Sequence, residues 1–88
     1  MSYPTARTDE LDAAETAICE IGSHFWFSGL TLEWQKFLVA NTVETFDHYE
    51  VTMEKAAQKL FEFYVETVRA YPEAKTMNPW KENLPIGS

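Results

Sequence analysis

The sequence predicts an all-α fold, a helical hairpin in which a short helix over residues 8–27 precedes a long amphipathic helix over residues 31–71. Two observations predict it. Apolar residues recur at intervals of three and four through both segments, which is the period of one helix face. Residues that interrupt helices occur within this stretch only at Gly22, Gly29 and Pro72.

The first helix is expected to begin at Thr8, whose hydroxyl can accept hydrogen bonds from the free N–H groups of the first helical turn. Its end is left open between Gly22 and Phe27. The segment Ser28-Gly29-Leu30 is a natural turn, and Thr31 can cap the helix that follows. The apolar stripe of the first helix comprises Leu11, Ala14, Ile18, Ile21 and Phe25.

The second helix carries the strongest periodic pattern in the chain. Its apolar seam repeats every seven residues at Val39, Phe46, Met53 and Leu60, and continues through Tyr64, while the opposite face is charged. Pro72 is expected to end it, because the residue before a proline avoids the α region. Residues 72–88 are then expected to form an extended tail, residues 1–7 to be flexible, and residues 1–88 to form one small domain.

The two predicted helices differ in length. At about 1.5 Å per residue the second would be about 60 Å long, roughly twice the first, so the stripe from Met53 to Tyr71 would lie bare. Three outcomes are open: a second copy covers the stripe, the long helix breaks near residues 50–52 and folds back, or a different protein binds there. We favour the first, a homo-oligomer and most simply a dimer.

Charge and composition restrict the function classes. Fourteen acidic against seven basic residues give a net charge of −7, which disfavours nucleic-acid binding. No apolar run approaches the roughly 20 residues of a membrane span, and the N-terminal segment lacks the apolar core of a signal peptide. We therefore expect a cytoplasmic protein. Cys19 is the only cysteine, so the chain has no internal disulfide.

Two carboxylate–histidine pairs, Glu20 with His24 and Glu44 with His48, have the four-residue spacing that could place both side chains on one helix face. The second pair falls on the outer face of its helix, whereas bundle metal sites point inward. A metal ion bound between two subunits stays open as the only arrangement in which such a pair would form a good site. We otherwise expect no metal, no cofactor and no catalytic residues, and hence a protein that is not an enzyme.

Aromatic residues cluster where the hairpin turns. They form either a partner-binding tip, since Trp and Phe dominate interface hot spots, or the end of the protein's own core, closed over by Trp80. Both alternatives stay open from the sequence. The candidate partner-binding residues, from this tip and from the stripe, are Phe25, Trp26, Phe27, Trp34, Phe37, Met53, Leu60 and Tyr64.

The leading functional hypothesis is a protein–protein interaction module, a small acidic adaptor or accessory subunit. An alternative is an acidic inhibitor, of the kind that phages use, which blocks a basic protein surface. The segment from Trp34 to Tyr71 also resembles the helices of phasins in its length and in its pattern of aromatic and acidic residues. Phasins coat polyester storage granules. That resemblance implies an amphipathic coat on apolar granules.

Overall fold

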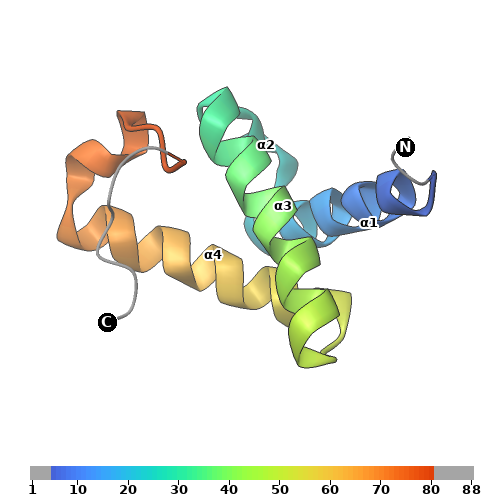
Figure 1. The fold of residues 1–88 in the computed structure, drawn as a ribbon. Helices are drawn as coiled ribbons and strands as arrows, with labels where there is room; N and C mark the ends of the chain where they lie inside the picture. The colour runs from blue at the N-terminus through green and yellow to red at the C-terminus, as the bar shows by residue number, and fades with distance from the viewer. Residues whose placement is uncertain (1–4, 81–88) are drawn as a thin grey trace.

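The computed structural model describes residues 5–80, with side chains from residue 9 onward, as four α-helices and a short 3₁₀ helix (Figure 1). No strand occurs in this range, so the all-α prediction is confirmed for it. No helix in this range is long and apolar enough to cross a membrane. In chain order the elements are α1 (Thr5–Gly22), α2 (His24–Ser28), α3 (Leu32–Tyr49), α4 (Met53–Ala70) and η1 (Pro72–Thr76).

The predicted helix over residues 8–27 is divided at Ser23. α1 ends at Gly22, the earlier of the two ends that the sequence left open. Ser23 adopts a φ of 93° and its side chain accepts a 3.1 Å hydrogen bond from the backbone N–H of Trp26, which starts α2. This break turns α2 away from the stripe of α1. As a result Phe25, predicted to lie on that stripe, is 92% exposed.

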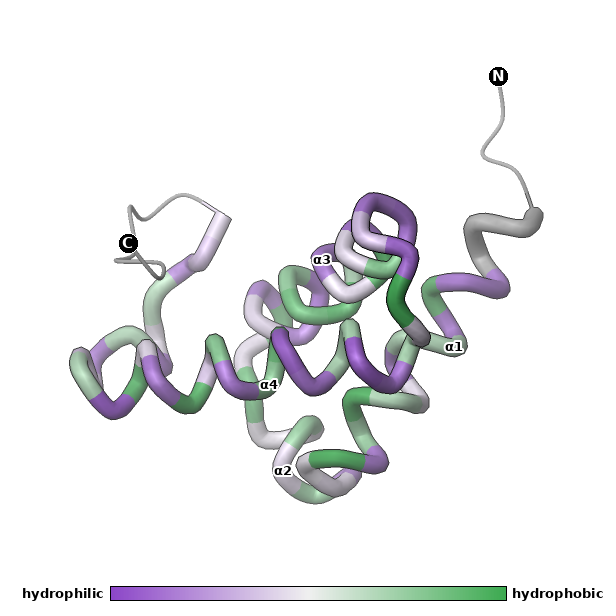
Figure 2. The backbone as a smooth tube through the Cα atoms, turned by 90° about the horizontal axis from the view of Figure 1, so that it is seen from below, coloured by the Kyte–Doolittle hydropathy of each residue, from purple (hydrophilic) through white to green (hydrophobic). Residues whose placement is uncertain are grey.

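The prediction of one continuous helix over residues 31–71 is wrong. α3 ends at Tyr49, Glu50 takes the left-handed conformation, and the hydroxyl of Thr52 accepts a hydrogen bond from the N–H of Lys55 to cap α4. A break near residues 50–52 was one of the three outcomes left open. Since α3 and α4 cross steeply (Figures 1 and 2), the longest dimension of the molecule is 36 Å. The helix length on which the resemblance to phasins rested is therefore absent.

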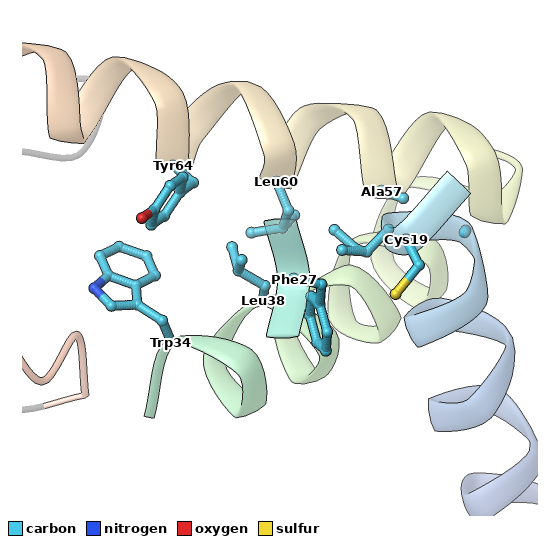
Figure 3. Packing of buried hydrophobic residues seen from close by; sticks show 9 residues of the cluster. Cys19, Phe27, Trp34, Leu38, Ala57, Leu60 and Tyr64 are labelled. Atoms are coloured by element: carbon cyan, nitrogen blue, oxygen red, sulfur yellow. The ribbon is translucent and has the colours of Figure 1, made fainter. Parts of the chain in front are cut away.

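The core forms where α4 packs against both α1 and α3 (Figure 3). Hydrophilic and hydrophobic residues alternate along α4 (Figure 2), and its buried face carries Leu60 and Tyr64. Helices of the same chain thus cover the middle of the stripe on which a second copy was expected to bind, and the dimer stays a prediction. The buried cluster consists of Ala17, Ile18, Cys19, Phe27, Trp34, Leu38, Ala57, Leu60 and Tyr64.

The segment after α4 folds back onto the helices. α4 ends at Ala70, one residue before the Tyr71 expected from Pro72, and Tyr71 leaves the helical conformation, as its position before a proline favours. Residues 72–76 then form η1, a 3₁₀ helix, so this part of the tail is not extended as predicted. The predicted flexibility of residues 1–4 and the predicted extension of residues 81–88 lie outside the described residues. Residues 5–7 belong to α1.

Candidate functional site

Most of the predicted partner-binding residues pack inside this chain. Trp34 is fully buried, and its ring meets Tyr64 edge to face with centroids 4.8 Å apart (Figure 3). The ring of Trp26 packs in the same way against Tyr64 and Phe61. Phe27 is only 6% exposed. These rings occupy the positions expected of the protein's own core.

The remaining predicted residues divide between the core and its edge. Leu60 is buried, and Met53 is partly buried against the core cluster. Phe37 is half-buried, and the ring of Trp80 packs edge-on against it with centroids 5.4 Å apart, which is the closure by Trp80 that the sequence left open. Of the aromatic tip, Phe25 alone stands almost wholly in solvent.

A groove with a volume of about 320 Å³ lies between α1 and α3. Its floor includes the buried ring of Phe27. Two large side chains on its walls remain open to solvent, Leu32 at 59% and Trp80 at 54% exposed. The groove is lined by Leu11, Asp12 and Glu15 from α1, Phe27 from α2, Leu32, Gln35, Lys36, Val39 and Ala40 from α3, and Trp80.

Local sequence places each wall of this groove. Thr31 accepts a 3.2 Å hydrogen bond from the N–H of Trp34, as predicted, and this cap starts α3 with Leu32 in its first turn. Leu32 and Val39 lie seven residues apart, so they project from one face of α3. Trp80 reaches this region because the segment after α4 turns back toward α3.

The two walls of the groove differ in charge. The α1 wall carries the exposed carboxylates of Asp12 and Glu15, which are three residues apart and therefore share one helix face. Neither takes part in an ion pair within the described part of the chain. The α3 wall carries the single cation of Lys36. The groove is thus apolar along its base and acidic along one edge.

The groups considered for chemistry lie elsewhere. Cys19 is only 2% exposed, and burial, followed by the charge of Glu15, raises the pKa of its thiol. Glu44 and His48 form a 3.3 Å surface pair on α3, whereas the break at Ser23 separates Glu20 from His24, so the helical spacing assumed for that pair does not apply. Among residues 5–80 no group of three metal-ligating side chains could hold an ion.

Sequence reasoning did not identify the groove. Leu11 was placed on the apolar stripe of the first helix, but nothing in the sequence places it opposite Leu32. That juxtaposition depends on how α1 crosses α3, and the crossing follows from the breaks at Ser23 and Glu50. The only local signal was the seven-residue spacing of Leu32 and Val39.

Comparison of the chain with protein-family models, with curated proteins and with solved structures found no match.

Proposed function

We propose that this chain is a non-enzymatic protein–protein interaction module, and that its partner binds in the groove between α1 and α3. The observation that carries the proposal is the exposure of Leu32 and Trp80 on the walls of an apolar groove. Large apolar side chains gathered around a concavity are typical of binding surfaces.

The energetics favour this surface over the other exposed apolar residues. Covering a large apolar side chain contributes about 1.5–3 kcal/mol, and a few such anchors supply most of the affinity of an interface. Leu32 and Trp80 can be covered by the same partner, because they line one groove together with Val39 and Leu11. Phe25 projects from α2 and does not line this groove.

The chemistry of the chain supports binding rather than catalysis. A nucleophilic cysteine needs an accessible thiolate, whereas Cys19 is buried and its pKa is raised. The groove itself is lined by apolar side chains with only one amide, two carboxylates and one ammonium group on its walls. Such a lining is suited to apolar side chains of a partner.

The test uses the full chain as bait in an affinity purification of partner proteins from an extract of its native source. Three versions of the chain are compared: the parent, Leu32→Glu and Tyr49→Glu. Leu32→Glu places a charge on the groove wall at an exposed position, and Tyr49→Glu makes the matched change at another exposed position of α3, outside the groove. We expect one specific protein to be retained by the parent chain and by Tyr49→Glu, and to be lost with Leu32→Glu.

Two results would contradict the proposal. If no protein is retained specifically by the parent chain under any salt condition, the interaction module itself fails. If a protein is retained equally by all three versions, the groove is not its binding site. An adaptor that binds through apolar anchors should keep its partner as salt rises, whereas an inhibitor that acts by charge alone should lose it.

A further inference from the structure

Along α3 the groove is as long as a short helical segment. Leu32 and Val39 lie seven residues apart on α3, which corresponds to about 10 Å or two helical turns. An amphipathic helix that enters such a groove presents apolar anchors at positions i, i+3 or i+4, and i+7. Two to three turns of a partner helix match the length over which α3 lines the groove.

The acidic edge of the groove indicates which charges that helix carries. Asp12 and Glu15 are both exposed at the α1 edge, and Asp9, Glu10 and Glu20 add to the negative charge of the same helix. The sequence contains no Lys or Arg from residue 8 to residue 35. A helix seated in the groove therefore gains from Lys or Arg along the edge that faces α1, and an acidic helix is repelled there.

Other classes of occupant fit less well. The groove is open, since Leu32 and Trp80 are more than half exposed, whereas small-molecule sites usually enclose most of their ligand. The net charge of −7 opposes nucleic acid and anionic lipid surfaces. A second copy of this chain would bring the same negative charge to the acidic edge, which weakens that alternative.

We propose, resting on the function proposed above, that the α1/α3 groove binds a basic amphipathic helix of a partner protein. The apolar face of that helix covers Leu32, Val39 and Trp80, and its Lys or Arg side chains lie along the α1 edge opposite Asp12 and Glu15. The apolar face of the partner helix supplies most of the affinity, and the acidic α1 edge of the groove selects basic helices over acidic ones.

The test uses synthetic, fluorescently labelled helical peptides of about 16 residues, long enough for a marginally stable helix. One peptide carries Leu at i, i+4 and i+7 with Lys along one flank, and its control has Glu in place of each Lys. Fluorescence anisotropy with the full chain measures both affinities. We expect the Lys peptide to bind at least about tenfold more tightly than the Glu peptide at low salt, and the ratio to shrink at high salt.

Variants of the chain locate the effect. Asp12→Asn combined with Glu15→Gln should weaken the Lys peptide by roughly two- to fivefold for each charge removed, as expected for exposed ion pairs. The matched control, Glu54→Gln with Glu66→Gln, makes the same change in net charge on α4, which contributes no residue to the groove. We expect it to leave both affinities unchanged. Leu32→Glu should abolish binding while circular dichroism shows the parent helix content.

Four results would overturn the inference. Equal binding of the Lys and Glu peptides that is lost with Leu32→Glu contradicts the basic partner but leaves the groove as a binding site. Binding unaffected by Leu32→Glu places the peptides elsewhere. Self-association that Leu32→Glu removes identifies a second copy as the occupant. If neither peptide binds, the proposal of a basic amphipathic helix as the occupant is wrong as well. The affinity purification decides separately whether a partner exists.

Discussion

The indole N–H of Trp34 donates a 2.7 Å hydrogen bond to the backbone carbonyl oxygen of Ala74, 40 positions further along the chain. Both residues are fully buried. The bond joins the first turn of α3 to η1, so the chain after α4 is held against the core by a polar contact as well as by packing. The same carbonyl also accepts a 3.1 Å hydrogen bond from the backbone N–H of Met77, so the group that would be left buried without a partner is the indole N–H.

The variant Trp34→Phe keeps an aromatic ring and removes only the N–H and part of the ring. We expect it to lower the free energy of unfolding by about 1–3 kcal/mol, since it removes one of the two hydrogen bonds to the Ala74 carbonyl and leaves a small cavity beside it. Urea unfolding followed by circular dichroism measures the change. Trp80→Phe is the matched control at a half-exposed ring, and an equal loss in both variants would contradict the importance of the hydrogen bond.

Gly22 allows the ring of Trp26 to lie against the end of α1. A Cβ atom at this position would overlap that ring and come within 2.9 Å of the ring of Phe61. We expect Gly22→Ala to lower the thermal midpoint, with a loss of about 1–3 kcal/mol from overpacking. At Gly29 the nearest atoms to an added Cβ are 3.5 Å away, so Gly29→Ala should change the midpoint little. A stable Gly22→Ala variant would show that Trp26 can move.

Glu50 adopts the left-handed helical conformation, with φ 52° and ψ 41°, between α3 and α4. A side chain in this conformation costs roughly 1–2 kcal/mol, which glycine avoids at some loss of chain entropy. We expect Glu50→Gly to raise the free energy of unfolding by about 0.5–1 kcal/mol. Lys59→Gly, at an exposed position inside α4, should instead lower it by about 1 kcal/mol. If both glycines destabilise the protein, the turn does not have this conformation in solution.

The raised pKa values of two buried groups, the thiol of Cys19 and the phenol of Tyr64, lead us to expect a loss of stability in alkali. Burial raises the pKa of Cys19 above its ordinary value of 9.0, with a further contribution from Glu15, and burial raises the pKa of Tyr64 above 10.0. Each group binds its proton more tightly in the folded state than in the unfolded state. Their contribution to stability is therefore complete below these ordinary values and is lost as pH rises through the raised ones.

We expect the urea midpoint to fall between about pH 8 and about pH 11. The double variant Cys19→Ala with Tyr64→Phe serves as the control. At about pH 8 the urea midpoint of the double variant should be lower than that of the parent, because core contacts are removed. Between about pH 8 and about pH 11, however, the midpoint of the double variant should fall by less than that of the parent. An identical fall in the parent and the double variant would assign the alkaline loss to other groups.

The sequence predicted those features of the fold that depend on neighbouring residues. The cap at Thr31 and the end of α4 just before Pro72 follow from side-chain chemistry within four residues. The breaks at Ser23 and Glu50 were left open by the sequence rather than predicted, because neither residue is a glycine or proline. Ser23 adopts a positive φ at the point where Trp26 packs over Gly22. Glu50 also adopts a positive φ, at the turn after which α4 packs onto α1 and α3.

The site was harder to predict than the fold for the same reason. Leu60 and Tyr64 lie on an apolar stripe, and a stripe looks alike whether the same chain or another one covers it. Folding at residues 50–52 gives them partners within the chain. Conversely Leu32 and Trp80, nearly fifty positions apart, become one surface only after the last segment returns to α3.

The link between Trp34 and Ala74 also has a consequence for the order of folding. The bond closes a loop that contains all of α4, so it can form only after that helix has docked on its neighbours. Its formation should coincide with the rate-limiting step rather than precede it. In a variant with Trp26 and Trp80 replaced by Phe, the indole of Trp34 should therefore report that late event, because its emission moves to shorter wavelength when the ring is buried.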